Sequence, residues 1–251
     1  ETGQFLLDVT ARGALMPGAD GYTAARHVRL VHAGVRHLVR AHVRESSGDA
    51  GEETEPINQE FLIGTLISFS LSILQLLDTM EIEYDQSAAE DYVHLWNVVG
   101  FLLGIDADLL PFDRDDLRQL DLLIRERNFG PSTAAHEMTG ALLTVLRGMV
   151  PRWMSSVPQT LMRLLVGEEV ADDIGVPKKG WSAWLLIRAR PVVRLLSALQ
   201  LHSRLMRRMA RHTGRHVWQG FIDSKRRAGR PRFEVPDHLA RAWRVENRTE
   251  S

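Results

Sequence analysis

The longest uncharged stretch of the chain, Phe61 to Leu77, restricts the possible folds more than any other feature. A stretch of this kind either lies inside a globular core or enters a membrane. It falls short of the roughly twenty apolar residues that a bilayer crossing needs, and glycine, serine and threonine dilute it. We therefore predict a central buried helix over 57–80, opened by Pro56 at its first turn, and no transmembrane segment. The small residues of this helix allow a neighbour or a flat ligand to approach closely.

Helical patterns also dominate the rest of the chain. No segment alternates apolar and polar residues over a useful length, and no internal repeat occurs. With 44% hydrophobic residues the chain can bury a substantial core. The sequence predicts an all-α protein, a single multi-helix globular domain over 1–251 with an upstream part before Glu1. Further helices are expected at 23–44, 87–103, 113–128, 133–150, 159–166 and 182–211, the last interrupted at Pro191, with mixed or loop structure at 5–15 and 167–177.

The net charge of −1 hides a strong asymmetry along the chain. From Glu45 to Asp113 there are fifteen acidic residues and no lysine or arginine. From Lys178 to Arg232 there are fifteen basic residues and one acidic residue. This pattern predicts two solvated faces of opposite sign. The basic C-terminal helical segment, 178–232, also has the charge to attract a phosphate polymer or an anionic membrane.

Several kinds of chemistry are excluded or unsupported. The chain has no cysteine, which excludes disulfides, thiolate zinc sites, iron–sulfur clusters and a cysteine nucleophile. No nucleophile-elbow GxSxG motif and no glycine-rich phosphate loop occurs. His136 and Glu137 fail the HExxH zinc motif, because Gly140 stands where the second histidine belongs. A GRP triplet at 229–231 matches minor-groove arms only weakly, and no nucleic-acid partner is expected.

The helix expected at 23–44 carries four of the ten histidines. At about 100° per residue, Val28, Val35 and Val39 lie on one side of His32, whereas Arg29 and Arg36 lie on the other. An axial haem ligand needs such surroundings, because iron binds a neutral imidazole, the macrocycle needs apolar cover and the propionates need cations. A solvated helix rim around a boundary histidine gives the same pattern, so both interpretations stay open here. The other histidines of this helix are five residues apart, which points them away from one shared metal.

A series of short motifs runs along nearly the whole chain. They are Thr2 with FLLDV, Gly13, Leu15, Pro17-Gly18, Gly21, VRLVHAGVRHLV, PINQE from Pro56, GTLISFS at 64–70, Trp96, Gly100, Leu103-Gly104-Ile105, Leu110-Pro111, LLVGEE from Leu164 and Gly175-Val176-Pro177. In these motifs and in their order the chain resembles the latex clearing proteins and their wider relatives, the mpaB-type rubber oxygenase catalytic domains. This resemblance favours the haem interpretation of the helix at 23–44.

The resemblance implies a haem b protein with a globin-like haem pocket between central helices. The histidine of the RLVHAxVRH stretch is the family's proximal iron ligand, which here is His32. The flanking arginines match Arg29 and Arg36, and we predict that they bind the cofactor. Thr2 and Thr65 match threonines that approach the haem cavity, and we predict catalytic roles for both.

The resemblance also implies an activity. The family's reaction is the oxidative cleavage of an isoprenoid carbon–carbon double bond by dioxygen, which leaves an aldehyde and a ketone end. The expected partner is a hydrophobic isoprenoid or a polymer such as poly(cis-1,4-isoprene). The family's carboxylate base falls upstream of Glu1, and a lysine that caps the distal iron falls near position 1, where this chain has glutamate. The protein is expected to be secreted if it is a latex clearing protein proper, and cytoplasmic or membrane-associated if it is a wider relative.

Three functional hypotheses follow, from different classes. The first is a haem b oxygenase that acts on polyisoprene or a shorter isoprenoid. The second is a helical protein of the same fold that binds haem or lipid without turnover. The third is a nucleic-acid or membrane-surface binder that uses the basic half, including Arg226, Arg227 and Arg230.

Overall fold

The computed structural model describes residues 2–47, 55–178 and 180–203, together with 208, 209, 212–214, 216 and 220. The chain divides into two compact units, Glu1–Arg207 and Arg208–Ser251. Every regular element among the described residues is helical, which confirms the all-α prediction. In the first unit these elements are α1 (Thr2–Thr10), α2 (Asp20–Ser47), α3 (Gln59–Phe69), α4 (Leu71–Thr79), α5 (Gln86–Leu103), η1 (Ala107–Leu109), α6 (Arg114–Asn128), α7 (Thr133–Gly148), η2 (Arg152–Met154), α8 (Val157–Val166), α9 (Glu168–Asp173) and α10 (Trp181–His202).

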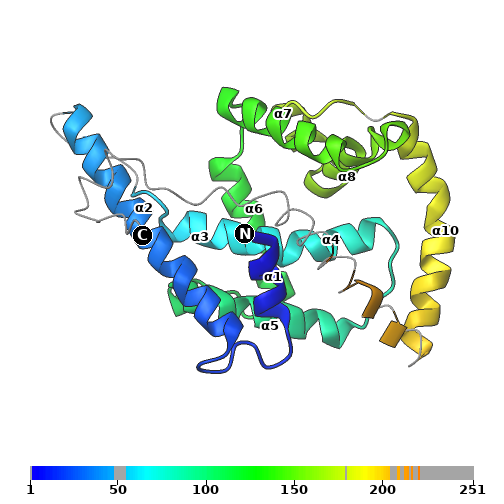
Figure 1. Ribbon diagram of the computed structural model, residues 1–251, viewed down its shortest axis with the longest axis horizontal. Coiled ribbons are helices and arrows are strands. Elements are labelled where there is room, and N and C mark those ends of the chain that lie inside the picture. Colours follow the sequence, from blue (N-terminus) through cyan, green and yellow to red (C-terminus); the bar gives the residue numbers. More distant parts are fainter. Residues whose placement is uncertain are drawn as a thin grey trace, which may run out of the picture. The chain divides into compact units, whose positions relative to one another are not determined.

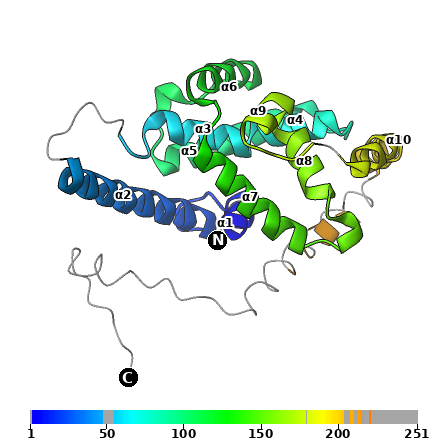
Figure 2. The same ribbon diagram turned by 90° about the horizontal axis from the view of Figure 1, so that it is seen from above.

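The main core forms where α3, α4 and α5 pack together. Helix α2 packs on the α5 side of these three helices, and α6 packs on the opposite side, against α3 and α4 (Figure 1, Figure 2). Trp96 of α5 is 2% exposed and stacks on Phe69, with ring centroids 5.3 Å apart. The Tyr92 ring is nearly perpendicular to the same indole, with ring centroids 6.2 Å apart. The buried apolar residues of this core are Val9, Leu62, Ile63, Leu66, Ile67, Leu71, Leu74, Ala89, Val93, Trp96, Val99, Ile105, Leu117 and Ile124.

The predicted central helix is two helices. Gln59–Thr79 is long and apolar enough, by length and composition, to cross a membrane, yet one side of it builds the main core. It breaks at Ser70, whose hydroxyl donates a hydrogen bond back to the Leu66 carbonyl, a contact that bends helices. The expected start at Pro56 is wrong, because Asn58 caps the helix and accepts a hydrogen bond from the Phe61 amide at 2.9 Å.

The N-terminal helices form a hairpin that the sequence predicted only in part. The region over 5–15 was expected to be irregular, but α1 covers Thr2–Thr10 and buries Val9 completely. The loop that follows is tight. A side chain at Gly21 would place its Cβ 2.5 Å from the Asp8 carbonyl oxygen, so only glycine lets α2 start this close to α1. Helix α2 begins at Asp20, three residues before the predicted start at 23.

The C-terminal helices have a small core of their own, built from Leu143, Ala171 and Val176. Helix α8 contacts α4, α7, α9 and α10. Two expectations are wrong here: the segment after α8 contains α9 rather than only a loop, and α10 continues through Pro191 without interruption. Residues 221–251 lie outside the described part of the chain, and with them the arginines of the nucleic-acid hypothesis, so the extent of the domain over 1–251 stays a prediction.

Candidate functional site

His32 lies in the middle of α2, and its ring is half-buried. The Nδ1 atom is buried and has no hydrogen-bond partner in the described part of the chain. Burial, and after it the positive charge of Arg36, lowers the pKa of His32 from its usual value of 6.5. The imidazole is therefore neutral at neutral pH, which is the form that binds a metal.

Arg36 follows one helical turn after His32 and, like it, has a buried nitrogen, here Nε, without a hydrogen-bond partner among the described residues. Buried nitrogens of this kind are nearly always hydrogen-bonded, and an unsatisfied one asks for an explanation. Two of them lie on adjacent turns of one helix, His32 Nδ1 and Arg36 Nε, and both are free to bind a further polar group. The residues present thus fit a haem, with an imidazole for the iron and a guanidinium N–H for a propionate.

The surface next to His32 is apolar. Val28 is half-buried, whereas Val35 and Val39 are each 39% exposed and Val31 is 49% exposed. Exposed valines in a row on one helix face are costly in water. A porphyrin macrocycle would cover such a face, and it needs one side chain for the iron because its own nitrogens supply four ligands. No group of three His, Cys, Asp or Glu side chains that could hold a metal ion occurs among the described residues.

Arg29 does not share the position of Arg36. Its guanidinium packs over Gly104, where an added Cβ would stand 3.1 Å from the Arg29 Cζ atom. Gly104 is the left-handed cap of α5, with φ +99°, and its carbonyl also accepts a hydrogen bond from Gln59 at 3.0 Å. A cation at a helix C-terminus is stabilised by the unpaired carbonyl groups there. The two arginines predicted together at the cofactor thus meet different surroundings, and the cofactor role of Arg29 stays a prediction.

The two predicted catalytic threonines lie on other helices. Thr2 is the first residue of α1 and is exposed. Thr65 lies on the exposed side of α3, and its hydroxyl donates to the Phe61 carbonyl at 2.9 Å. Because that donor is used, Thr65 as it stands can only accept a hydrogen bond. No hydrogen bond joins either threonine to His32 within the described residues, so their catalytic roles stay predictions.

His136, half of the failed zinc motif, has a packing role that the sequence did not indicate. Its Nε2 atom makes a hydrogen bond of 2.8 Å with the Asp173 carbonyl. The imidazole lies against Gly175, at which an added Cβ would stand 2.7 Å from the ring. Since a carbonyl can only accept, His136 donates and fastens α7 to the loop after α9.

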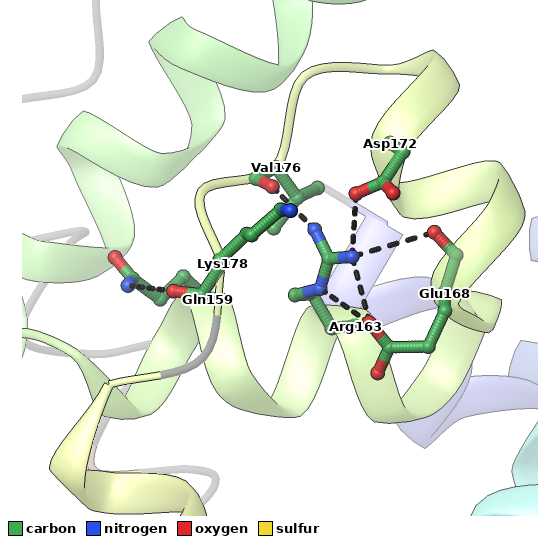
Figure 3. Close-up of polar contacts among 6 residues, drawn as sticks. All are labelled: Gln159, Arg163, Glu168, Asp172, Val176 and Lys178. Atoms are coloured by element: carbon green, nitrogen blue, oxygen red, sulfur yellow. Dashed lines mark hydrogen bonds and ion pairs between the residues drawn. The ribbon is translucent and has the colours of Figure 1, made fainter.

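A second polar cluster surrounds Arg163 of α8, which is 2% exposed (Figure 3). Its Nη2 atom lies 2.7 Å from Glu168 Oε2 and 2.6 Å from Asp172 Oδ1, and its Nη1 atom donates to the Val176 carbonyl at 2.6 Å. The Nε atom also donates to Glu168, at 3.0 Å. The side chain thus binds α9 and the loop after it at every nitrogen. The cluster holds this part of the fold together, and we assign no ligand to it.

The comparisons with known proteins agree with the features of α2. The family model described as "ER-bound oxygenase mpaB/B'/Rubber oxygenase, catalytic domain" matches residues 1–199. The chain belongs to this family. Helix α2, the main core and the Arg163 cluster all lie within the matched residues, so the mpaB/rubber oxygenase domain accounts for nearly all of the first unit.

A curated relative is the rubber oxygenase of Streptomyces sp. (strain K30), which is 26% identical over 198 residues. The match covers 77% of this chain and 47% of the relative, so the chain spans about half the length of that protein. No solved structure matches the chain. The comparisons support an enzyme of the oxygenase class. They do not identify individual site residues.

The lowered pKa of His32 predicts how stability depends on pH. In the unfolded chain His32 takes up a proton near its usual pKa of 6.5, whereas in the folded chain it resists protonation. As pH falls below that value, the unfolded state binds more protons and the folded state loses stability. We expect the unfolding free energy of the haem-free wild type to fall more steeply below neutral pH than that of His32→Gln, measured by urea denaturation at several pH values. Parallel curves for the two proteins would contradict this expectation.

Proposed function

We propose that this chain is the catalytic domain of a haem b-dependent oxygenase that cleaves isoprenoid carbon–carbon double bonds with dioxygen. The observation that carries the proposal is the pair of buried, unpartnered nitrogens, His32 Nδ1 and Arg36 Nε, beside the exposed valines of α2. The membership of the mpaB/rubber oxygenase family supports the same chemistry. The resemblance of the RLVHAGVRH stretch supports His32 as the iron ligand.

Five residues of α2 then have proposed roles. His32 would hold the iron, and it stays neutral because burial and Arg36 both oppose its protonation. Arg36 would donate an N–H to a propionate, and Val31, Val35 and Val39 would exclude water from the macrocycle. When bound, the haem supplies the activation of dioxygen. In the overall reaction both oxygen atoms end in the products, one in an aldehyde and one in a ketone, so no external reductant is needed.

Two threonines are proposed to act on the reacting molecules. Thr65 presents an acceptor oxygen on the exposed side of α3, because its hydrogen is bound to the Phe61 carbonyl. Thr2 stands exposed at the start of α1. The substrate is an apolar polyisoprene or a shorter isoprenoid, which offers no polar handle and is held by apolar contact and by the shape of its site.

The test combines a spectrum with a product analysis. The purified protein is expected to show a Soret band, and its pyridine haemochrome is expected to give about one haem b per chain, the ratio for a single axial histidine. Incubation with polyisoprene or a short isoprenoid under isotopically labelled dioxygen should place one labelled oxygen in each new carbonyl group. A protein that neither contains nor takes up haem would refute the proposal. Haem without labelled carbonyls would favour the second hypothesis, a haem-binding protein of the same fold without turnover.

A further inference from the structure

Helix α10 is fixed to the rest of the first unit along one side. Ser197 is 5% exposed and accepts a hydrogen bond from the Glu83 amide at 2.9 Å. Arg194 lies 3.5 Å from the Glu83 carboxylate, and Arg190 lies 3.9 Å from that of Glu81. These contacts hold α10 against the loop between α4 and α5, so the helix presents a defined opposite side to solvent.

That opposite side is mostly apolar, and the exposed Arg188 lies within it. Its exposed apolar residues form what we call the outer face of α10: Trp184, Val192, Leu195, Leu196 and Leu199. At about 100° per residue they fall within an arc of roughly 120°, turned away from Ser197. Trp184 and Leu195 are each 61% exposed. Large apolar side chains gathered in one exposed row mark an interaction surface, because a soluble protein otherwise keeps such rows covered.

A second exposed tryptophan lies near the N-terminal end of α10. Gly180, just before α10, lies against Ser156, where an added Cβ would stand 3.5 Å from the serine Cβ. Trp153 of η2 comes three residues before Ser156 and is 66% exposed. Figure 1 shows α10 starting beside the junction of α7 and α8, the region of the chain that contains η2. Both indoles are therefore exposed at the same end of α10.

The charges around the outer face are positive. The guanidinium of Arg188 lies 4.8 Å above the Trp184 ring and is exposed. Arg152 and Lys178, near the same end, are exposed as well. Helix α10 contains no acidic residue, and the two glutamates on its docked side already face arginines. The outer face thus combines apolar side chains with nearby cations. This combination complements a layered surface with an apolar interior and anionic groups at its boundary with water.

We propose that the outer face of α10, together with Trp153, docks on a lipid bilayer that carries anionic headgroups. Tryptophan and arginine prefer the headgroup level of a membrane, and the leucines below them would enter the acyl boundary. The docked side of α10 keeps the helix parallel to the membrane surface. A nucleic acid fits less well. Its phosphates bind cations and its bases stack on aromatic rings, so the row of aliphatic side chains would stay exposed. This docking surface lies apart from His32 and does not depend on the proposed oxygenase activity.

The test is co-sedimentation of the whole protein with vesicles of phosphatidylcholine, with and without phosphatidylserine. We expect binding to the anionic vesicles, weakened by added salt and by Arg188→Glu. The pair Leu195→Ser/Leu196→Ser should weaken this binding by about tenfold or more, since two inserted leucines are lost. Lipids with brominated tails should quench the tryptophan fluorescence of the wild type. The Trp184→Phe variant should show much less quenching.

A matched control exists on α6, where Leu122 and Leu123 are an equally exposed pair of adjacent leucines. Leu122→Ser/Leu123→Ser should bind vesicles like the wild type. The proposal is overturned if both pairs weaken binding equally, if neutral and anionic vesicles bind alike, or if no vesicle binds. It is also overturned if the outer face proves to join two copies of the chain, which sizing would show as a dimer that Leu195→Ser/Leu196→Ser dissociates in the absence of lipid.

Discussion

The His32→Ala variant is expected to purify without haem and to show no Soret band. The reason is that the haem iron would lose the imidazole proposed as its ligand, while the remaining valines offer only apolar contact to the macrocycle. The loss should be nearly complete, and added haem should not restore the spectrum. The measurement is the pyridine haemochrome, expressed per chain and compared with the wild type prepared in parallel.

Two other histidines serve as controls for this expectation. His27 on the same helix and His94 on α5 are both exposed, so alanine at either position should leave the haem content unchanged. Far-UV circular dichroism should show that all three variants keep their helices, because none of the removed rings fills the main core. Equal haem loss in all three variants, or haem retained in His32→Ala, would mean that another residue binds the iron.

The Trp96→Ala variant is expected to lose a large part of the stability of the fold. Trp96 is 2% exposed and fills the centre of the main core, stacked on Phe69 and nearly perpendicular to the Tyr92 ring. Removing a buried aromatic side chain of this size costs about 3–5 kcal/mol, because both the apolar burial and the surrounding contacts are lost. This is a large fraction of the roughly 5–15 kcal/mol that keeps a typical domain folded. Urea denaturation followed by circular dichroism measures the change.

Two comparisons make this prediction specific. Trp96→Phe keeps a ring against Phe69 and should cost clearly less than the alanine. Leu122→Ala, at a site on α6 that is 66% exposed, should change the free energy of unfolding by less than about 0.5 kcal/mol. If Trp96→Ala were as stable as Leu122→Ala, the packing of α3, α4 and α5 around this indole would be wrong.

Most of the helices could be predicted because their ends carry local signals. Gly104 ends α5 in the left-handed conformation, and Asp113 caps α6. The prediction failed where packing decides against local preference. Proline at position 191 suggested a break, but α10 passes through it, since the contacts of Ser197 and Arg194 hold the following turns in place. Helix α1 was missed because its burial of Val9 depends on α2 and the main core.

The geometry of the candidate site could be predicted only in part. The sequence pattern places valines and Arg36 around His32, and α2 is the helix that this arrangement requires, because a helix fixes which residues share a face. It did not predict that Arg29 packs on the cap of α5, since that contact joins residues distant in sequence. Nor did it indicate that Arg163 is buried, because its partners lie on α9 and in the loop that follows.

The contact between Arg29 and Gly104 has a mechanical consequence for His32. Arg29 and His32 are three residues apart on α2, so a fixed rotation about the helix axis relates the contact of Arg29 with the end of α5 to the direction of the His32 side chain. Lengthening the segment between them by one residue would rotate the imidazole by about 100° relative to that contact, whereas a change in the loop after α2 would leave its direction intact. The direction of the His32 imidazole is therefore linked to a contact outside its own helix, the one between Arg29 and Gly104 at the end of α5.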